Sequence, residues 1–397
     1  MKKKLCCVFL LITITMFFSG CWSRTEPKNL SVTNSVLIDI KDDGKIQLTK
    51  EVMKPSGDSG GKGDGGMKNS VVLLNCEGKT VAEAVRDELN GKALFGGNLK
   101  ARLFSEKFAK KGMMPVLDFL SRDHLTDETS FVAVIKGKEP KRVYSSVTGM
   151  SDMVGNYIDE LSKTQIKIKN ESVYVTTLDF IKDYYEDGKQ PVAGLIEIVE
   201  DESKPESSSQ AGSQDASEKK YKIVYSGLAA FKDDKLVGYM NANETRAYNL
   251  VTDKIVGAVV SLPDNLTSGK VTKSNSKIKT DIENGQVTIS VNTKVALSVI
   301  QDGGNFDVNK IGPLKTLEQK FNKQLETEIA ASIQKAQTEF QSDIFGFGGY
   351  VHIQHPKEWR NMKTNWDDIF SKAKVNVRVD SSVVMSGETK NAFDQKE

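Results

Sequence analysis

The chain has 397 residues, which is enough for two or three domains. Apolar residues make up 38% and charged residues 27%, a composition that excludes a disordered chain and a polytopic membrane protein. Because 55 Lys and Arg balance 53 Asp and Glu, and only three His and four Cys are present, we predict no nucleic-acid partner, no metal, no cofactor and no disulfide scaffold.

The N-terminus predicts export and lipidation. Residues 1–20 contain three lysines and then a 14-residue apolar run, shorter than the roughly 20 residues that span a bilayer. Ser19 and Gly20 precede Cys21, as at the cleavage site of a bacterial lipoprotein, although Phe18 stands where Leu is usual. An ordinary secretory signal is the alternative. We expect residues 1–20 to be a signal peptide and Cys21 to be acylated, which would hold the chain at a lipid bilayer.

Maturation would leave little cysteine chemistry. Removal of residues 1–20 leaves 52 Lys and Arg against 53 Asp and Glu, and only Cys76 keeps its thiol once Cys21 is acylated. Cys76 ends an apolar run, so we expect a buried structural thiol.

Residues 22–138 have the pattern of a mixed α and β domain. Alternation over 36–40 and 46–52 around Asp43-Gly44 predicts a hairpin, and residues 55–66 predict a flexible loop. Further strands are expected at 71–74, 101–104 and 131–135. Helices are expected at 80–89, after Ser105, and through Leu120 from a first turn that contains Pro115.

Residues 139–258 form the expected middle domain, with helices at 151–162 and 177–186 and strands at 192–199 and 221–231. Residues 201–220 contain no large apolar side chain and predict a disordered, dispensable loop. A hairpin is expected at 227–240.

A short helix should follow this hairpin, with Asn243 as its cap and Glu244 and Arg246 on its surface. An exposed Arg there suits pairing with a carboxylate of a partner. Glu244 and Arg246 are therefore candidate partner-binding residues; the alternative is that they brace their own helix.

Residues 259–397 predict a C-terminal domain. Period-two alternation on both sides of Asn284-Gly285 predicts a hairpin, and apolar spacing of three or four predicts an amphipathic helix over 314–344. A second helix is expected from Pro356 and a final strand from Val375. We predict an antiparallel sheet packed by the long helix, and an α+β protein of three mixed domains in series behind the signal peptide.

No motif assembles a catalytic site. Residues 57–61 match the G-x-S-x-G pattern, but glycines continue to Gly66 where a nucleophile elbow needs a helix. His352 and His355 are spaced like metal ligands but have no third ligand nearby, so structural or surface roles are expected. We predict no catalytic residues and no enzyme activity.

Four segments stand out together: Cys21-Trp22-Ser23-Arg24 with Leu30 and Ile38-Asp39; Asn98-Leu99-Lys100 with 117–123; 227–246; and 356–379. In this order they resemble the Ger(x)C family, the lipoprotein C subunit of nutrient germinant receptors of endospore-forming bacteria. Ser23 departs from the acidic residue common there, and the 201–220 insertion is longer than usual.

The resemblance implies a three-domain α+β protein on the outer face of the spore inner membrane. It would work with two integral membrane subunits, A and B, and sometimes a small D subunit, in sensing nutrients and triggering germination, without enzymatic activity. The alternative is a substrate-binding lipoprotein of a membrane transporter, which would have two lobes around a ligand cleft.

Overall fold

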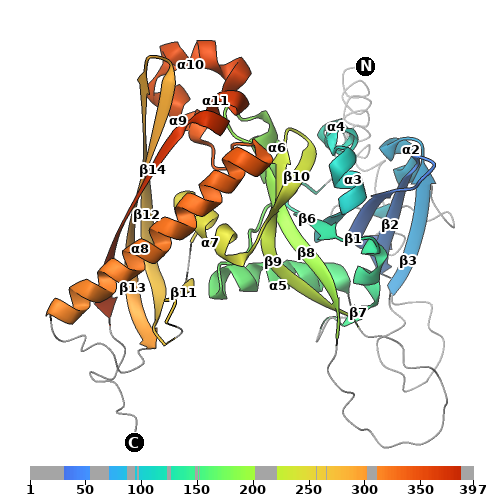
Figure 1. Cartoon of the computed structure of the whole chain (residues 1–397). Coiled ribbons are helices and arrows are strands. Elements are labelled where there is room, and N and C mark those ends of the chain that lie inside the picture. Colours follow the sequence, from blue (N-terminus) through green and yellow to red (C-terminus); the bar gives the residue numbers. More distant parts are fainter. Residues whose placement is uncertain are drawn as a thin grey trace, which may run out of the picture.

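The computed structural model describes residues 31–53, 71–86, 94–95, 98–122, 127–147, 151, 153–201, 221–255, 257–264, 266–301 and 311–385. It has mixed α/β architecture with two sheets (Figure 1). The predicted loop 55–66 and all but residue 201 of the loop 201–220 lie outside the described residues.

The first sheet has ten strands, with the main order β10-β9-β8-β6-β5-β1-β2-β3. Its strands are β1 (Ser31–Ile40), β2 (Ile46–Met53), β3 (Val71–Gly78), β4 (Leu94–Phe95), β5 (Ala101–Ser105), β6 (Phe131–Lys136), β7 (Ser146–Val147), β8 (Val192–Glu200), β9 (Tyr221–Lys232) and β10 (Lys235–Met240). The hairpins expected at 36–52 and 227–240 are β1–β2 and β9–β10.

Helices cover both faces of this sheet. Helix α5 (Val154–Ile168) packs on one face, where Val154 and Ile158 join a core with Leu37 and Leu103. The opposite face carries α2 (Val81–Arg86), α3 (Glu106–Lys111), α4 (Met114–Arg122) and α6 (Thr177–Tyr185). Successive side chains of a strand point to opposite faces, so β1 contributes to both cores.

The first sheet continues across residue 138, where we expected a domain boundary. Strand β6 pairs in parallel with β8, with Val134 opposite Leu195. The backbone groups of the two regions therefore complete one hydrogen-bonded sheet. The division at 138 remains a prediction from sequence.

The second sheet has the order β11-β12-β13-β14. Its strands are β11 (Val259–Ser261), β12 (Ser268–Glu283), β13 (Gln286–Gln301) and β14 (Lys374–Met385). Asn284 and Gly285 both have positive φ, 51° and 80°, as a tight hairpin turn requires. Strand β14 pairs in parallel with β13, so the sheet is mixed and not purely antiparallel as we expected.

Helix α8 (Ile311–Lys335) lies along one face of the second sheet, in the packing predicted for the long helix. A π-helical segment at Ala336–Phe340 follows it, and Gln341 then ends the helical run in the left-handed conformation, φ 48°. The helix therefore stops short of residue 344. Glu326 and Glu318 on α8 accept hydrogen bonds from the backbone of β14.

The helical segment expected from Pro356 is interrupted. It consists of α10 (Pro356–Met362) and α11 (Trp366–Lys372) with a 3-10 turn at Lys363–Asn365 between them. Helix α9 (Phe347–Gln354) precedes them and was not predicted, because its first turn contains Gly348 and Gly349.

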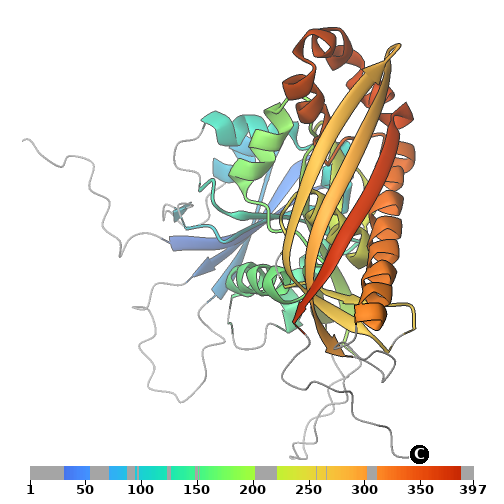
Figure 2. The same ribbon diagram turned by 90° about the vertical axis from the view of Figure 1, so that its left-hand side faces the viewer.

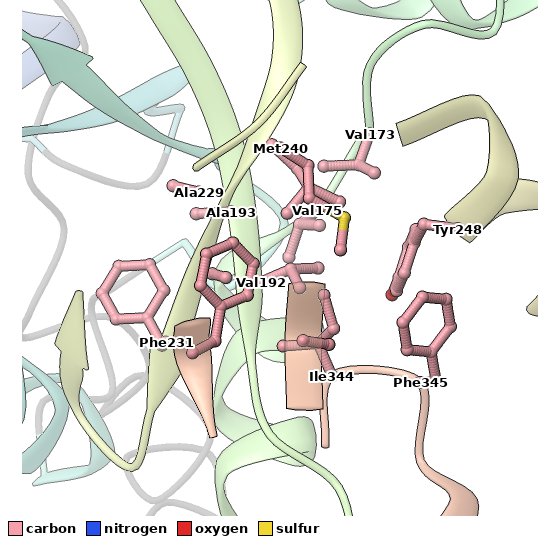
Figure 3. Close-up of a cluster of buried hydrophobic side chains, with 14 of the residues drawn as sticks. Val173, Val175, Val192, Ala193, Ala229, Phe231, Met240, Tyr248, Ile344 and Phe345 are labelled. Atoms are coloured by element: carbon pink, nitrogen blue, oxygen red, sulfur yellow. The ribbon is translucent and has the colours of Figure 1, made fainter. Parts of the chain in front are cut away.

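A continuous apolar core joins the two sheets. Helix α7 (Ala242–Val251) lies between them, and its Tyr248 packs near Phe345 (Figures 1 and 3). Ile344, the residue before Phe345, belongs to the same apolar cluster and faces Val192 of the first sheet (Figure 3). A view rotated by 90° shows the broad face of the second sheet that lies opposite α8, and no helix covers this face (Figure 2).

Candidate functional site

The lipidation site predicted at Cys21 lies outside the described residues and stays a prediction. The other cysteine of interest, Cys76 on β3, is only 1% exposed, which confirms that its thiol is buried in the core.

The start of α7 differs from the expectation. Its cap is Asn241, whose Oδ1 accepts a hydrogen bond from Glu244 N at 3.0 Å, while Glu244 Oε2 accepts from Asn241 N at 2.8 Å. This reciprocal pair is a capping box. The prediction that Asn243 caps this helix was wrong. A capping box joins residues three positions apart, and Asn241, not Asn243, stands three residues before Glu244.

Arg246 is not on the surface, so that expectation was also wrong. Its side chain is 6% exposed, and its Nη2 donates to both carboxylate oxygens of Glu328 on α8, each at 2.8 Å. Its Nη1 donates to the carbonyl of Val259 at 3.3 Å. The guanidinium is thus used inside the chain, where it joins α7 to α8.

Glu244 takes part in the same connection. Lys335 near the end of α8 donates to its carboxylate at 2.8 Å, and both side chains are about one-fifth exposed. Glu244 caps its own helix, as the alternative interpretation had it, but both Glu244 and Arg246 also brace α7 against α8, which neither interpretation anticipated. Contact with another protein through these groups is not supported by their geometry.

A second polar connection was missed by sequence analysis. Asp343 is fully buried, and its carboxylate accepts hydrogen bonds from Gly346 N, Gly348 N and Trp366 Nε1 at 2.8–2.9 Å. Burial raises its pKa to about 6, although these donors oppose the shift. An isolated Asp in a glycine-rich stretch gave no signal of this role.

Ser342 and Asp343 also form hydrogen bonds with strand β9 and with the segment just before β8. Gln190 N donates to the Asp343 carbonyl at 2.9 Å, and Ser342 Oγ donates to the carbonyl of Phe231 at 2.6 Å. A Cβ on Gly348 would lie 2.5 Å from the Cα of Gly188, which has φ 79°. The two glycines therefore allow a close backbone approach at this joint.

The histidine pair serves packing. His355 Nε2 hydrogen-bonds the carbonyl of Thr280 at 2.9 Å, and the ring of His352 stacks on Trp359 with centroids 5.7 Å apart. Across the described residues, no group of three or more His, Cys, Asp or Glu side chains is arranged to hold a metal ion.

An open groove of about 980 Å³ lies beside β1, β2, α2, α3 and α4. Ile40, Ile46 and Phe108 contribute apolar lining, and Arg86 and Arg122 are among its charged residues. No His or Cys is found among its described lining residues, so nothing there supplies an imidazole base or a thiol nucleophile.

Two family profiles match the chain in order. "Spore germination protein N-terminal domain" matches residues 23–198, and "Spore germination B3/ GerAC like, C-terminal" matches residues 226–387. The chain therefore has the two-part organisation of a class of spore germination proteins. It belongs to the Ger(x)C family, as the resemblance in its sequence indicated.

Curated relatives align over nearly their full length. Spore germination protein B3 of Bacillus subtilis (strain 168) is 27% identical over 392 residues, covering 93% of this chain and 94% of that protein. Spore germination protein KC of the same organism is 25% identical, covering 92% and 91%. Spore germination protein A3 is also 25% identical, covering 96% of each.

A solved structure has the same fold. The crystal structure of the GerBC protein superposes with a TM-score of 0.51 at 21% identity, covering 88% of this chain and 96% of that one. Within the described part of the chain, no helix combines the length and apolar character needed to cross a bilayer.

Proposed function

We propose that this protein is the C subunit of a nutrient germinant receptor and acts by binding other receptor subunits, not by catalysis. The observation that carries the proposal is the match of both family profiles, in order, together with relatives named as spore germination proteins that align over at least 91% of their length. The proposed partners are the membrane-embedded A and B subunits, with a small D subunit in some receptors.

The proposed location is the outer face of the spore inner membrane, with acylated Cys21 as the anchor. Ser31, where β1 begins, is ten positions after Cys21. A tether of this kind raises the local concentration of the body near membrane partners into roughly the millimolar range, so weak contacts suffice for assembly.

The transporter alternative has less support. It would place a ligand cleft between two lobes that move relative to each other. The two sheets here are joined by a packed core around Tyr248 and Phe345, and by the buried Arg246–Glu328 pair. Such a joint favours a rigid body over a hinged ligand trap.

The proposal is tested by deleting the gene in a spore-former and scoring the response to each nutrient. We expect the deletion to abolish the response to one set of nutrients, and the full chain expressed in trans to restore it. Affinity purification of the tagged chain from the spore inner membrane should recover the A and B subunits. A normal response to every nutrient, with no membrane subunit recovered, would contradict the proposal.

The anchor makes a separate prediction. We expect Cys21→Ala to leave the signal uncleaved or to release the chain from the membrane fraction, because the thiol that carries the acyl chains is missing. Cys76→Ala is the control and should remain membrane-bound. Mass spectrometry of the membrane-extracted protein checks the modification, and an unmodified Cys21 would refute it.

A further inference from the structure

The outer face of the second sheet is strongly cationic. Residues on β12, β13 and β14 alternate between a buried set that faces α8 and an exposed set that faces away from it. The exposed set carries seven cations: Lys270, Lys273, Lys277, Lys279, Lys294, Lys374 and Arg378. Three carboxylates share this face: Asp281, Glu283 and Asp380. The surplus of four positive charges contrasts with the near-neutral chain.

The strand register places these cations close together. Lys277 lies opposite Asn292, and Asn292 lies opposite Arg378, so one row crosses the sheet with an uncharged residue between two cations. In neighbouring rows, Lys279 lies opposite Ser290 and Lys273 opposite Ala296. Lys294 on the middle strand β13 lies opposite Asp380, and the other six cations lie on the flanking strands β12 and β14.

These cations have no ion-pair partner within the described part of the chain. None of the seven forms a salt bridge with another described residue, whereas Lys41, Lys136, Lys163 and Lys363 elsewhere each do. Like charges gathered on one face repel one another, and that repulsion is relieved when an anionic surface binds.

The face is also open and mostly without large apolar side chains. No helix covers it in the view that shows it directly (Figure 2). Ile300 and Val384 are the large apolar residues exposed here, each about half-exposed, and both lie near the ends of their strands. Recognition at this face would therefore be mainly electrostatic.

We propose that this face, which we call the cationic sheet face, docks an acidic surface of another receptor subunit. The inference rests on the proposed function, which supplies membrane partners, and it adds the place and the chemistry of the contact. An anionic bilayer is the other surface with suitable charge, and the position of the face argues against it.

The position follows from the strand order. Strand β1, which follows the proposed anchor, is separated from β9 by β5, β6 and β8, a distance of roughly 19 Å at about 4.8 Å per strand. The cationic sheet face lies beyond β9 and α7 and points away from β1 (Figure 1). The layer formed by α7 and the layer formed by the second sheet each add about 10 Å to this distance. The cationic sheet face is therefore farther from β1 than the roughly 34 Å that ten extended residues reach. The anchored bilayer would therefore lie on the other side.

The test uses a triple variant and a matched control. Lys273→Gln, Lys277→Gln and Lys279→Gln together remove three charges from the cationic sheet face. Lys138→Gln, Lys169→Gln and Lys182→Gln remove three exposed charges from the first sheet's helices and loops. Each full-length chain is expressed in spores and purified by affinity tag from the inner membrane at about 50 mM and about 300 mM salt.

We expect the parent and the control triple to recover membrane subunits at low salt and less at high salt. The face triple should recover about tenfold less at low salt. Replacing the same three lysines with Arg keeps the charge and should restore recovery, which separates lost charge from misfolding. Equal recovery by the face and control triples would overturn the surface but not the proposed function; failure of the parent at both salts would overturn both.

The bilayer is tested directly. The full chain carrying Cys21→Ala is mixed with vesicles containing phosphatidylglycerol and sedimented. We expect little binding, and none that depends on Lys273, Lys277 and Lys279. Vesicle binding that the face triple abolishes would identify lipid as the occupant and overturn the proposal.

Discussion

Asp343 illustrates how a single buried residue organises a joint. Its carboxylate collects two backbone N–H groups of the 346–348 turn and the indole N–H of Trp366, so it fixes the start of α9 against α11. Desolvation makes the charged form expensive, and the three donors offset part of that cost.

Asp343 predicts a pH dependence of stability. Burial raises its pKa to about 6 in the native state, above the ordinary 3.8. Between pH 4 and 6 the native chain holds a proton that the unfolded chain releases, so this group makes the free energy of unfolding fall as pH rises, and the fall ends above about pH 6. The total is at most about 3 kcal/mol.

Urea unfolding of the parent and of Asp343→Asn at several pH values checks this. Carboxylates with a lowered pKa, such as Asp264, produce the opposite slope in both proteins, so the difference between the two isolates Asp343. A difference that does not change between pH 4 and 6 would contradict the expectation.

At the scale of elements, local chemistry decides where helices and turns begin. Ser105 caps α3, Thr176 and Asp179 form the capping box of α6, and Asn241 with Glu244 does so for α7. These side chains satisfy backbone N–H groups that have no partner within the helix. Helix starts are therefore set within a few residues of sequence.

The cap of α7 makes a paired prediction. Asn241→Ala removes the acceptor for Glu244 N and should cost about 1 kcal/mol of stability. Asn243 lies two residues further on, inside the first turn of α7, and does not cap the helix, so Asn243→Ala should change stability by less than about 0.5 kcal/mol. Chemical denaturation of both variants gives the comparison; equal effects would mean that the capping box is not the source of the stability.

At the scale of the whole molecule, α7 is the element that holds two sheets together. Its buried face contributes Tyr248 and Leu250 to the shared core, and its polar residues pair with α8. A buried ion pair costs desolvation energy, but its two ends are separated by 82 positions in sequence and so fix one arrangement of distant elements.

Arg246→Ala should therefore destabilise the whole body. It leaves the Glu328 carboxylate buried without its partner, which costs about 3–5 kcal/mol. Lys335→Ala is the control: its pair with Glu244 is one-fifth exposed and should cost less than about 1 kcal/mol. Melting curves of the two variants decide this. A stable Arg246→Ala protein with a lost nutrient response would instead return Arg246 to a partner contact.

Local sequence patterns were enough to predict most of the helices and strands and the family. Alternation around Asn284-Gly285 and the spacing of three or four over α8 are local patterns, because each reflects one buried face of one element. The motif segments likewise identified the Ger(x)C family, which the profile matches confirm.

The roles of the polar residues, in contrast, became clear from the packing of distant segments. Arg246 was expected on the surface because it stands on a short helix that follows a hairpin. It is buried because α8, which is distant in sequence, packs against that helix and pairs with it. The parallel pairing of β14 with β13 and the role of Asp343 were also beyond local patterns. Burial and pairing depend on which distant segments meet, and that is settled by packing of the whole chain, not by the spacing of residues along it.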